Sequence, residues 1–346
     1  MQSTNIFRRF AGPGIAALAV IGLVSACGNG GGGEAGAGNE GGEITLQFAS
    51  SQSQATPNYY CGMELFKERI ESQDLGITVD LFPDSQLGPD TERVASLQSG
   101  DIDMDLQEAG MASVYPQVGI LGAAYVFDDV DHAFNWIDNH SEDFKTGFNE
   151  ATDLTIIDGW FYGNRTFSSN EPIRSPEDLA GMQIRFPDTP QYLANAEALG
   201  ANAVAVAYEE VYVALQQGIA DGQENPVVGT KTASYDEVQN YVALNNHQVS
   251  IHWVTISDAT LEQMSQEQQD AVFETVRDIR AENRECVDQE TDEILQDWRD
   301  NGPLEVIEED EVDREAFITQ SEDYFRNHYT GEDLEFYESI RETSDN

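Results

Sequence analysis

Segments with alternating apolar and polar residues are interleaved along this chain with segments of helical periodicity. Alternation with a period of two predicts β-strands, whereas apolar residues spaced three and four apart predict amphipathic helices. The predicted strands cover residues 44–49, 77–82, 101–107, 154–161 and 182–186, and the first predicted helices cover 58–72 and 91–99. Interleaved strands and helices of this kind are typical of α/β domains with mixed sheets.

Two further helices are predicted from their capping sequences. Ser175 is followed by a proline and has Asp178 at the third helical position. Ser265 has Gln268 at the corresponding third position. The second sequence opens a periodic run that continues to about Asp300. A helix of about 35 residues would be about 50 Å long, which exceeds one small domain. We therefore expect this helix to brace two lobes.

The N-terminal residues have the pattern of a signal peptide and a tether. Arg8 and Arg9 precede an apolar run that is too short to span a bilayer and that ends in LVSAC. This ending is similar to the lipobox of bacterial lipoproteins, which makes Cys27 the expected lipidation site; an ordinary secretory signal is the alternative. Residues 1–26 are then the signal peptide, and the glycine-rich residues 27–42 a flexible tether. We expect an extracytoplasmic protein held at the outer face of the cell membrane by its lipid alone.

Acidic residues dominate the charge, with 64 Asp and Glu against 17 Lys and Arg and a formal net charge of −47. Nucleic acid is excluded as a natural partner, because phosphate binding needs a basic face. A heavily solvated, salt-adapted surface explains the acidity. Beyond Cys27, Cys61 and Cys286 form an even pair. Outside the cytoplasm they are a disulfide candidate, with two buried thiols as the alternative.

No metal, cofactor or catalytic motif is apparent. Asp101, Asp103 and Asp105 begin like a calcium-binding loop, but Leu106 and Ala112 stand where that loop needs glycine and glutamate. A strand with one polar face is the preferred interpretation. The five histidines have no ligand spacing, and neither a nucleophile elbow nor a phosphate-binding glycine loop is present. The sequence therefore does not predict an enzyme.

Two isolated arginines carry the strongest chemical signal. Arg165 lies in GWFYGNRTF and Arg185 in GMQIRFP, beside aromatic residues, in a chain where basic residues are scarce. A guanidinium offers a planar fork of donors that matches a carboxylate. The two residues are candidates for binding the carboxylate of a small organic acid. A structural ion pair is the alternative, while Arg174 beside a helix cap is assigned to the surface.

Five blocks of sequence resemble one family, namely LFPDSQLG (81–88), GDIDM (100–104), IRSPEDLAGMQIRFP (173–187), ALGAN (198–202) and VYVALQQGIADGQENP (211–226). The chain resembles the DctP-type extracytoplasmic solute receptors of TRAP transporters over nearly all residues after Cys27. The resemblance implies a periplasmic-binding-protein-like α/β fold, with two discontinuous lobes, a ligand cleft that closes by hinge bending and a long bracing helix. We expect lobe I to comprise residues 43–162 plus 251–290, and lobe II residues 163–250 plus 291–346.

The resemblance also implies roles for individual residues. Arg185 corresponds to the arginine that pairs with the ligand carboxylate, and Arg165 to a second contact. Asn225 of QENP is a third contact, and Tyr208 is expected to lie over the ligand, where many members have Phe.

Other positions follow from the alignment of the first lobe and of the second crossover. Ser51, Asp90 and Glu108 fall where polar residues select the ligand, and His252 and Trp253 fall near the cleft. Because Glu108 would lie near a carboxylate ligand, a sugar acid with hydroxyl groups is the preferred ligand class.

The function implied is that of a monomeric receptor, without catalytic activity, that captures an organic acid anion and delivers it to a TRAP permease. A C4-dicarboxylate using Arg165, or an aromatic acid using Trp160, Tyr208 or Trp253, remains an alternative. Receptors of ABC importers and sensory binding proteins are further alternatives.

Overall fold

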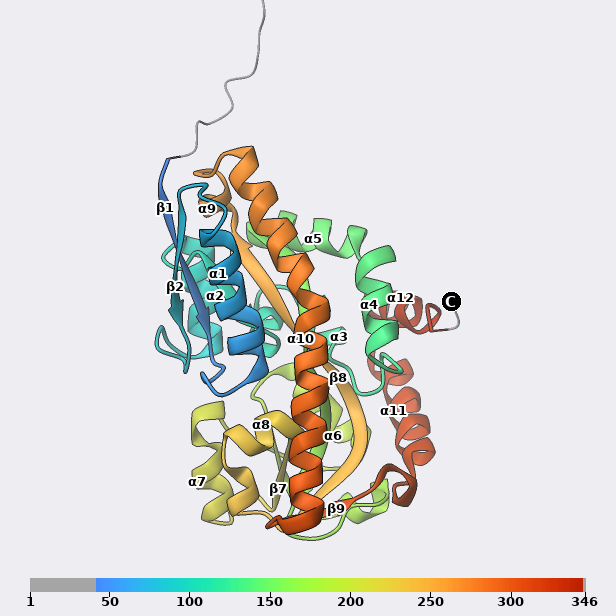
Figure 1. Cartoon of the computed structure of the whole chain (residues 1–346). Helices are drawn as coiled ribbons and strands as arrows, with labels where there is room; N and C mark the ends of the chain where they lie inside the picture. The colour runs from blue at the N-terminus through green and yellow to red at the C-terminus, as the bar shows by residue number, and fades with distance from the viewer. Residues whose placement is uncertain (1–41, 345–346) are drawn as a thin grey trace, which may run out of the picture. The chain divides into compact units, whose positions relative to one another are not determined.

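A nine-stranded mixed sheet organises the computed structural model, which describes residues 42–344 (Figure 1). The strand order is β2-β1-β3-β8-β4-β7-β5-β6, and β9 pairs with β8. The strands are β1 Ile44–Ser50, β2 Ile77–Phe82, β3 Met104–Gln107, β4 Leu154–Ser169, β5 Gln183–Phe186, β6 Asn202–Ala205, β7 Gly222–Pro226, β8 Tyr241–Ser257 and β9 Glu305–Ile307. Cys27, together with the predicted signal peptide and nearly all of the predicted tether, lies outside the described residues.

Helices cover the sheet, and most of the connections between strands are helical. The α-helices are α1 Glu64–Glu71, α2 Asp90–Ser99, α3 Gln117–Ile120, α4 Val130–Asn139, α5 Glu142–Thr152, α6 Pro190–Leu199, α7 Val211–Gln216, α8 Val227–Thr232, α9 Asp258–Leu261, α10 Gln266–Asn301, α11 Arg314–His328 and α12 Glu332–Arg341. One π-turn, η1 Tyr59–Met63, precedes α1, and the short 3₁₀ turns are η2 Ala109–Ser113, η3 Pro176–Leu179, η4 Tyr208–Glu210, η5 Tyr235–Glu237 and η6 Glu309–Glu311. Among the described residues, no helix has both the length and the apolar character needed to cross a membrane.

Two long antiparallel strands, β4 and β8, connect the two halves of the sheet. They have 16 and 17 residues, whereas a typical strand has about 5–6. Parallel strands β2, β1 and β3 lie on one side of this pair, and β7, β5 and β6 on the other. Register shifts interrupt the pairing, one of them between Phe161 and Gly163. Gly163 has φ +124°, a conformation that glycine adopts without a steric penalty.

The bracing helix predicted from the sequence is present as α10, which spans 36 residues. Ser265 caps it, and the side chains of Ser265 and Gln268 bond to each other's backbone N–H groups. In Figure 1 this helix passes along β4 and β8, with α1 beside its first half and α8 beside its second. A disulfide between Cys61 and Cys286 ties η1 to the middle of this helix.

The sheet is buried, with apolar side chains packed against both faces. One cluster lies under β1, β2, α1 and the first half of α10, and includes Trp160, whose indole N–H donates to the Val276 carbonyl at 3.0 Å. A second cluster joins α8, β8 and the end of α10 around Trp298. The largest cluster lies beside α3–α6, α11 and α12. Since α10 contributes to packing in both halves, it holds them against the common sheet.

Two of the three lobe boundaries expected from the sequence fall within the shared strands, and the third, at 290/291, falls within α10. Gly163 pairs with Ser250 across β4 and β8, so the expected boundaries at 162/163 and 250/251 lie side by side. The described residues form one compact unit, and the division into lobes at these positions stays a prediction.

Three local predictions need correction. The strand expected over residues 101–107 begins only at Met104, and both of its faces are buried, because Asp105 pairs with the buried Arg93. The helix expected after Ser175 is a single 3₁₀ turn, which stops where Gly181 takes φ +86°. The helix expected over 58–72 begins as the π-turn η1.

Candidate ligand-binding cavity

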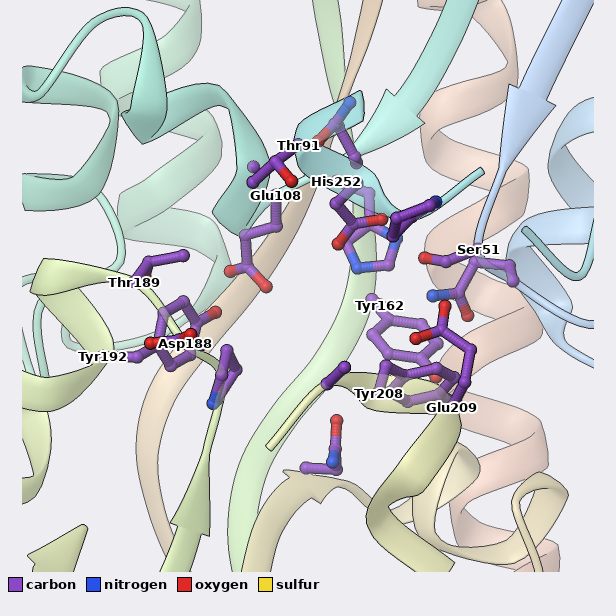
Figure 2. A pocket seen from close by; sticks show the side chains of 18 of the residues that line it. Ser51, Thr91, Glu108, Tyr162, Asp188, Thr189, Tyr192, Tyr208, Glu209 and His252 are labelled. Atoms are coloured by element: carbon purple, nitrogen blue, oxygen red, sulfur yellow. The ribbon is translucent and has the colours of Figure 1, made fainter. Parts of the chain in front are cut away.

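A cavity of about 360 Å³ lies where the carboxyl ends of the parallel strands on the two sides of the sheet face each other (Figure 2). Residues after β1 and β3 line it from one side, and residues after β5 and in β7 line it from the other. The crossing strands β4 and β8 form its floor. Its lining side chains come from Ser51, Gln52, Pro89, Asp90, Thr91, Gln107, Glu108, Tyr162, Arg165, Arg185, Pro187, Asp188, Thr189, Tyr192, Ala207, Tyr208, Glu209, Asn225 and His252, and Gly110 completes the wall.

Arg185, from β5, is buried and lacks an acidic partner among the described residues. It is 2% exposed, and its Nε donates to the Val206 carbonyl at 2.9 Å. The two terminal nitrogens, Nη1 and Nη2, make no hydrogen bond to any described residue. Burial lowers the pKa of this guanidinium, which nevertheless remains a cation at neutral pH. The site therefore contains a cation whose donor edge is free.

Arg165, from β4, is held by a buried carboxylate. Its Nε and Nη2 donate to the two carboxylate oxygens of Glu224 at 2.5 and 2.8 Å, and Nη2 also donates to the Glu224 carbonyl at 2.8 Å. His247 approaches the same carboxylate through Nε2 at 3.2 Å. Burial lowers the pKa of Arg165, but Glu224, together with Tyr192 and Glu108, more than offsets this and raises it well above normal. The structural ion pair that the sequence left open therefore exists, and Nη1 is the nitrogen left for other contacts.

Glu108 follows β3 and points into the cavity (Figure 2). Its carboxylate accepts hydrogen bonds from Gln248 at 2.9 Å and from Ser250 at 2.8 Å, both in β8, and lies 3.7 Å from Nη1 of Arg165. Burial raises its pKa against the opposing effect of Arg165. Glu108 is therefore held in place by β8, with lone pairs left for a ligand donor.

Asp90 begins α2 and lines the same side of the cavity. Its carboxylate accepts from Arg93 at 2.8 Å, and the buried Arg93 also contacts Asp105 at 3.2 Å. Ser51, directly after β1, also lines the cavity. Gln107 completes this wall, and an added Cβ at Gly110 would lie 2.0 Å from its Oε1, so a larger residue there would displace the end of the Gln107 side chain.

Aromatic rings and an amide form the rest of the lining. Tyr208 sits on η4, next to Tyr162 in Figure 2. The Tyr162 ring stacks on His252, with centroids 4.4 Å apart. Asn225, in β7, donates to Gln223 at 2.6 Å and lines the cavity. Eight of the nine residues predicted as ligand contacts therefore meet around one cavity.

Trp253, the ninth, does not line the cavity. Successive side chains of a strand point to opposite faces, so Trp253 points away when its neighbour His252 points in. Its ring lies 6.4 Å from Phe144 in the apolar core and is 2% exposed. The expectation that Trp253 lies near the ligand is therefore wrong. Trp160 is likewise fully buried in the core.

Several cavity residues were not identified from the sequence. Gln52, Gln107 and Tyr192 carry no local motif, and the role of Glu224 depends on the pairing of β7 with β4. The one available signal for Glu224 was its place inside the QENP block. Among the described residues, no cluster of acidic, histidine or cysteine side chains could hold a metal ion.

Comparison with known proteins agrees with this geometry. The sequence profile of the bacterial extracellular solute-binding proteins of family 7, DctP, matches residues 48–332. A 2,3-diketo-L-gulonate-binding periplasmic protein of Escherichia coli is 28% identical over 276 residues, covering 79% of this chain and 83% of its own. A sialic acid-binding periplasmic protein of Vibrio cholerae is 29% identical over 249 residues, covering 70% and 77%.

A solved structure shows the same fold with a ligand. The TRAP periplasmic solute-binding protein of Roseobacter denitrificans with bound L-galactonate has a TM-score of 0.79 and 27% identity, covering 86% of this chain and 99% of its own. The fold is thus the two-lobed one of TRAP periplasmic binding proteins. The family profile spans the cavity residues from both halves of the sheet. The chain therefore belongs to the bacterial extracellular solute-binding proteins of family 7, the extracytoplasmic solute receptors of TRAP transporters.

Proposed function

We propose that this receptor captures a sugar acid, a monocarboxylate with several hydroxyl groups, and delivers it to a TRAP permease. Arg185 holds the carboxylate, and the opposite wall binds the hydroxyl groups. The observation that carries the proposal is the buried Arg185 guanidinium, whose two terminal nitrogens lack partners among the described residues. A buried unpaired cation is costly, and a ligand carboxylate would relieve that cost with two parallel hydrogen bonds.

Polar atoms without partners in the cavity lining support the inference that the ligand carries hydroxyl groups. Gln52 Oε1, Gln107 Oε1 and Thr189 Oγ1 have no hydrogen-bond partner among the described residues. Glu108 adds a carboxylate on the same side as the two glutamines. Hydroxyl groups both donate and accept, so a polyhydroxy chain satisfies such a mixed set.

The charges of the cavity disfavour a dicarboxylate. A second ligand carboxylate would need a second available cation, but Glu224 already neutralises Arg165. It would also approach Glu108 and Asp90, and like charges in a poorly hydrated cavity repel each other. The aromatic acid loses two of its three expected partners, because Trp160 and Trp253 lie in the core.

Two of the relatives support this chemical class, although another is named for binding C4-dicarboxylates. The Roseobacter denitrificans structure holds L-galactonate, and the Escherichia coli relative is named for 2,3-diketo-L-gulonate. Both ligands combine a carboxylate with a chain of oxygen-bearing carbons.

Delivery depends on closure of the two halves over the ligand by bending at β4 and β8. A permease that recognises the closed form would distinguish loaded from empty receptor, because the ligand stabilises that form. We further propose a monomeric, non-catalytic receptor, anchored through a lipid on Cys27, with lobe boundaries at residues 162/163, 250/251 and 290/291.

A thermal-shift panel tests the ligand class. L-galactonate, L-gulonate, succinate and benzoate are each added to the purified protein over a concentration series. A ligand at 100 times its Kd stabilises the folded state by about 2.7 kcal/mol. We expect an increase in Tm with at least one aldonate and none with succinate or benzoate at matched concentrations. A shift with succinate alone would overturn the sugar-acid assignment, and turnover of a bound acid would overturn the non-catalytic one.

A further inference from the structure

His252 lines the cavity, and one of its two ring nitrogens contacts a buried asparagine. Its Nδ1 lies 3.4 Å from the side-chain nitrogen Nδ2 of Asn58, and its ring face stacks on Tyr162. Figure 2 shows the imidazole above the Tyr162 ring, between Glu108 and Ser51. Nε2 has no hydrogen-bond partner among the described residues, and it is therefore the nitrogen left for a ligand. What Nε2 offers to a ligand depends on which nitrogen carries the proton.

Asn58 faces His252 with its amide nitrogen, and a second asparagine contacts the other end of the amide. Asn283 Nδ2, on α10, donates to Asn58 Oδ1 at 3.2 Å. Both asparagines are fully buried. An amide nitrogen is a donor only, so His252 Nδ1 must accept, and in a neutral imidazole the proton then resides on Nε2.

The disulfide fixes the same two elements one turn further on. Cys61 lies three residues after Asn58, and Cys286 lies three residues after Asn283. The asparagine pair and the disulfide therefore connect η1 and α10 side by side. This covalent link maintains the spacing that the Asn283–Asn58 hydrogen bond requires.

His252 stays neutral at physiological pH. Burial lowers its pKa to about 3, and the positive charges of Arg165 and Arg93 add to this effect. A protonated imidazole would donate hydrogen bonds from both nitrogens, whereas a neutral imidazole carries a proton on only one of them.

We propose that Asn283 and Asn58 are positioning residues that hold His252 as its Nε2–H tautomer, so that the cavity offers a neutral hydrogen-bond donor to a carbonyl or hydroxyl oxygen of the ligand. This inference rests on the proposed function for the identity of the ligand, but not for the tautomer. This chain of hydrogen bonds from Asn283 through Asn58 to His252 favours a ligand oxygen that accepts a hydrogen bond, and it adds no charge to the site. It also connects ligand recognition on β8 to the bracing helix.

Side-chain NMR of the ligand-free protein tests the tautomer directly. Long-range ¹H–¹⁵N correlations at pH 7.5 distinguish the two tautomers of each histidine, and His252→Gln identifies the signals of His252. We expect the Nε2–H pattern. In Asn283→Asp the new carboxylate can only accept, so the Asn58 amide reverses, its oxygen faces His252, and the pattern changes to Nδ1–H. An Nδ1–H pattern in the unchanged protein, or no change in a folded Asn283→Asp, would overturn the proposal.

A second variant covers the case in which a buried carboxylate prevents folding. Asn283→Leu has a similar volume and removes the donor, which leaves the Asn58 amide free to take either orientation. We expect its His252 signals to lie between those of the two tautomers. Signals identical to those of the unchanged protein would show that Asn283 does not act on His252.

Binding of L-galactonate then tests the role in recognition. A glutamine amide nitrogen can take the place of Nε2–H, whereas an asparagine at this position is too short to reach it. We therefore expect His252→Gln to weaken binding less than His252→Asn, and Asn283→Asp to weaken it about 5- to 150-fold through an unpaired buried group. Equal losses in the two His252 variants would contradict the donor role. If L-galactonate fails to bind the unchanged protein, the proposed ligand class fails, while the tautomer result stands.

Discussion

At the scale of residues, Arg165 and Arg185 look alike in the sequence and differ in their surroundings. Arg165 is covered by the Glu224 carboxylate, whereas Arg185 meets a backbone carbonyl through one nitrogen and keeps two nitrogens free. A paired guanidinium positions its neighbours, and an unpaired one attracts an anion. The difference follows from strand pairing, because β7 brings Glu224 beside β4.

Arg185→Ala is expected to weaken binding of the sugar acid about 30- to 4000-fold, since losing one partner of a buried charge pair costs about 2–5 kcal/mol. Arg185→Lys should also bind poorly, because an ammonium lacks the planar fork. Titration calorimetry with L-galactonate measures both.

The matched control for Arg185 is Arg174→Ala, which removes a partly exposed arginine 3.6 Å from Glu311. Exposed ion pairs contribute about 0–1 kcal/mol, so binding and stability should hardly change. Affinity in Arg185→Ala equal to that in Arg174→Ala would contradict the assigned role of Arg185.

His252 makes the free energy of unfolding depend on pH. Burial, followed by Arg165 and Arg93, lowers its folded-state pKa to about 3, below the ordinary value of 6.5. Between these values the unfolded chain binds the proton and the folded chain does not. Stability from this group is therefore complete above about pH 6.5 and falls by up to about 1.4 kcal/mol per pH unit as the pH drops towards 3.

His252→Gln should remove this contribution and flatten the dependence. Urea denaturation at pH 7.5, 6 and 5 gives the free energy of unfolding of both proteins, and the gap between them should shrink as the pH falls. A gap that is constant with pH would show that His252 does not resist protonation in the folded state. His140→Gln is the matched control, because His140 is exposed.

At the scale of elements, β4, β8 and α10 decide where the site residues meet. β8 turns Gln248, Ser250 and His252 towards Glu108 and the cavity, since alternate residues share a face of a strand. The resemblance placed both His252 and Trp253 near the cleft and so assigned Trp253 to the wrong face. A resemblance aligns positions along the chain, whereas the pleat decides which of two neighbours points inwards.

Removing the link between η1 and α10 should destabilise the fold. The disulfide joins cysteines that are 225 positions apart in the sequence, and losing a native disulfide typically costs about 2–5 kcal/mol. We expect Cys61→Ser/Cys286→Ser, in a Cys27→Ser background, to unfold at correspondingly lower guanidinium concentration. Adding a reductant should lower the midpoint of the parent protein and leave that of the double variant unchanged. Equal midpoints for the oxidised parent and the double variant would show that the bond does not stabilise the fold.

At the scale of the whole molecule, the net charge of −47 opposes both folding and the approach of an anion. Self-repulsion acts over the Debye length, which falls from about 10 Å at 0.1 M salt to about 3 Å at 1 M. Arg185 is buried in the cavity, so its contact with a carboxylate is screened much less than exposed charges are. Adding salt should therefore stabilise the folded state more than it lowers the affinity for the ligand.

The Tm at pH 7.5 is expected to rise as NaCl increases from 0.1 to 1 M, because screening reduces repulsion among surface carboxylates. Near the sequence pI of about 4.1 the net charge approaches zero, and the same salt series at pH 4.5 should have a much smaller effect. Differential scanning calorimetry measures both series. A Tm that falls with salt at pH 7.5 would contradict an electrostatic origin.

The sequence by itself determined the family, the α/β class, the long capped helix and eight residues of the cavity wall. These features can be predicted from local periodicity, from helix caps and from contiguous blocks of sequence. All three patterns depend on residues that are neighbours along the chain. The tertiary structure decided which arginine is free, which face Trp253 takes, and how Asn58 and Asn283 meet behind His252. These depend on strand pairing and on contacts between residues up to 225 positions apart, and no local pattern encodes them.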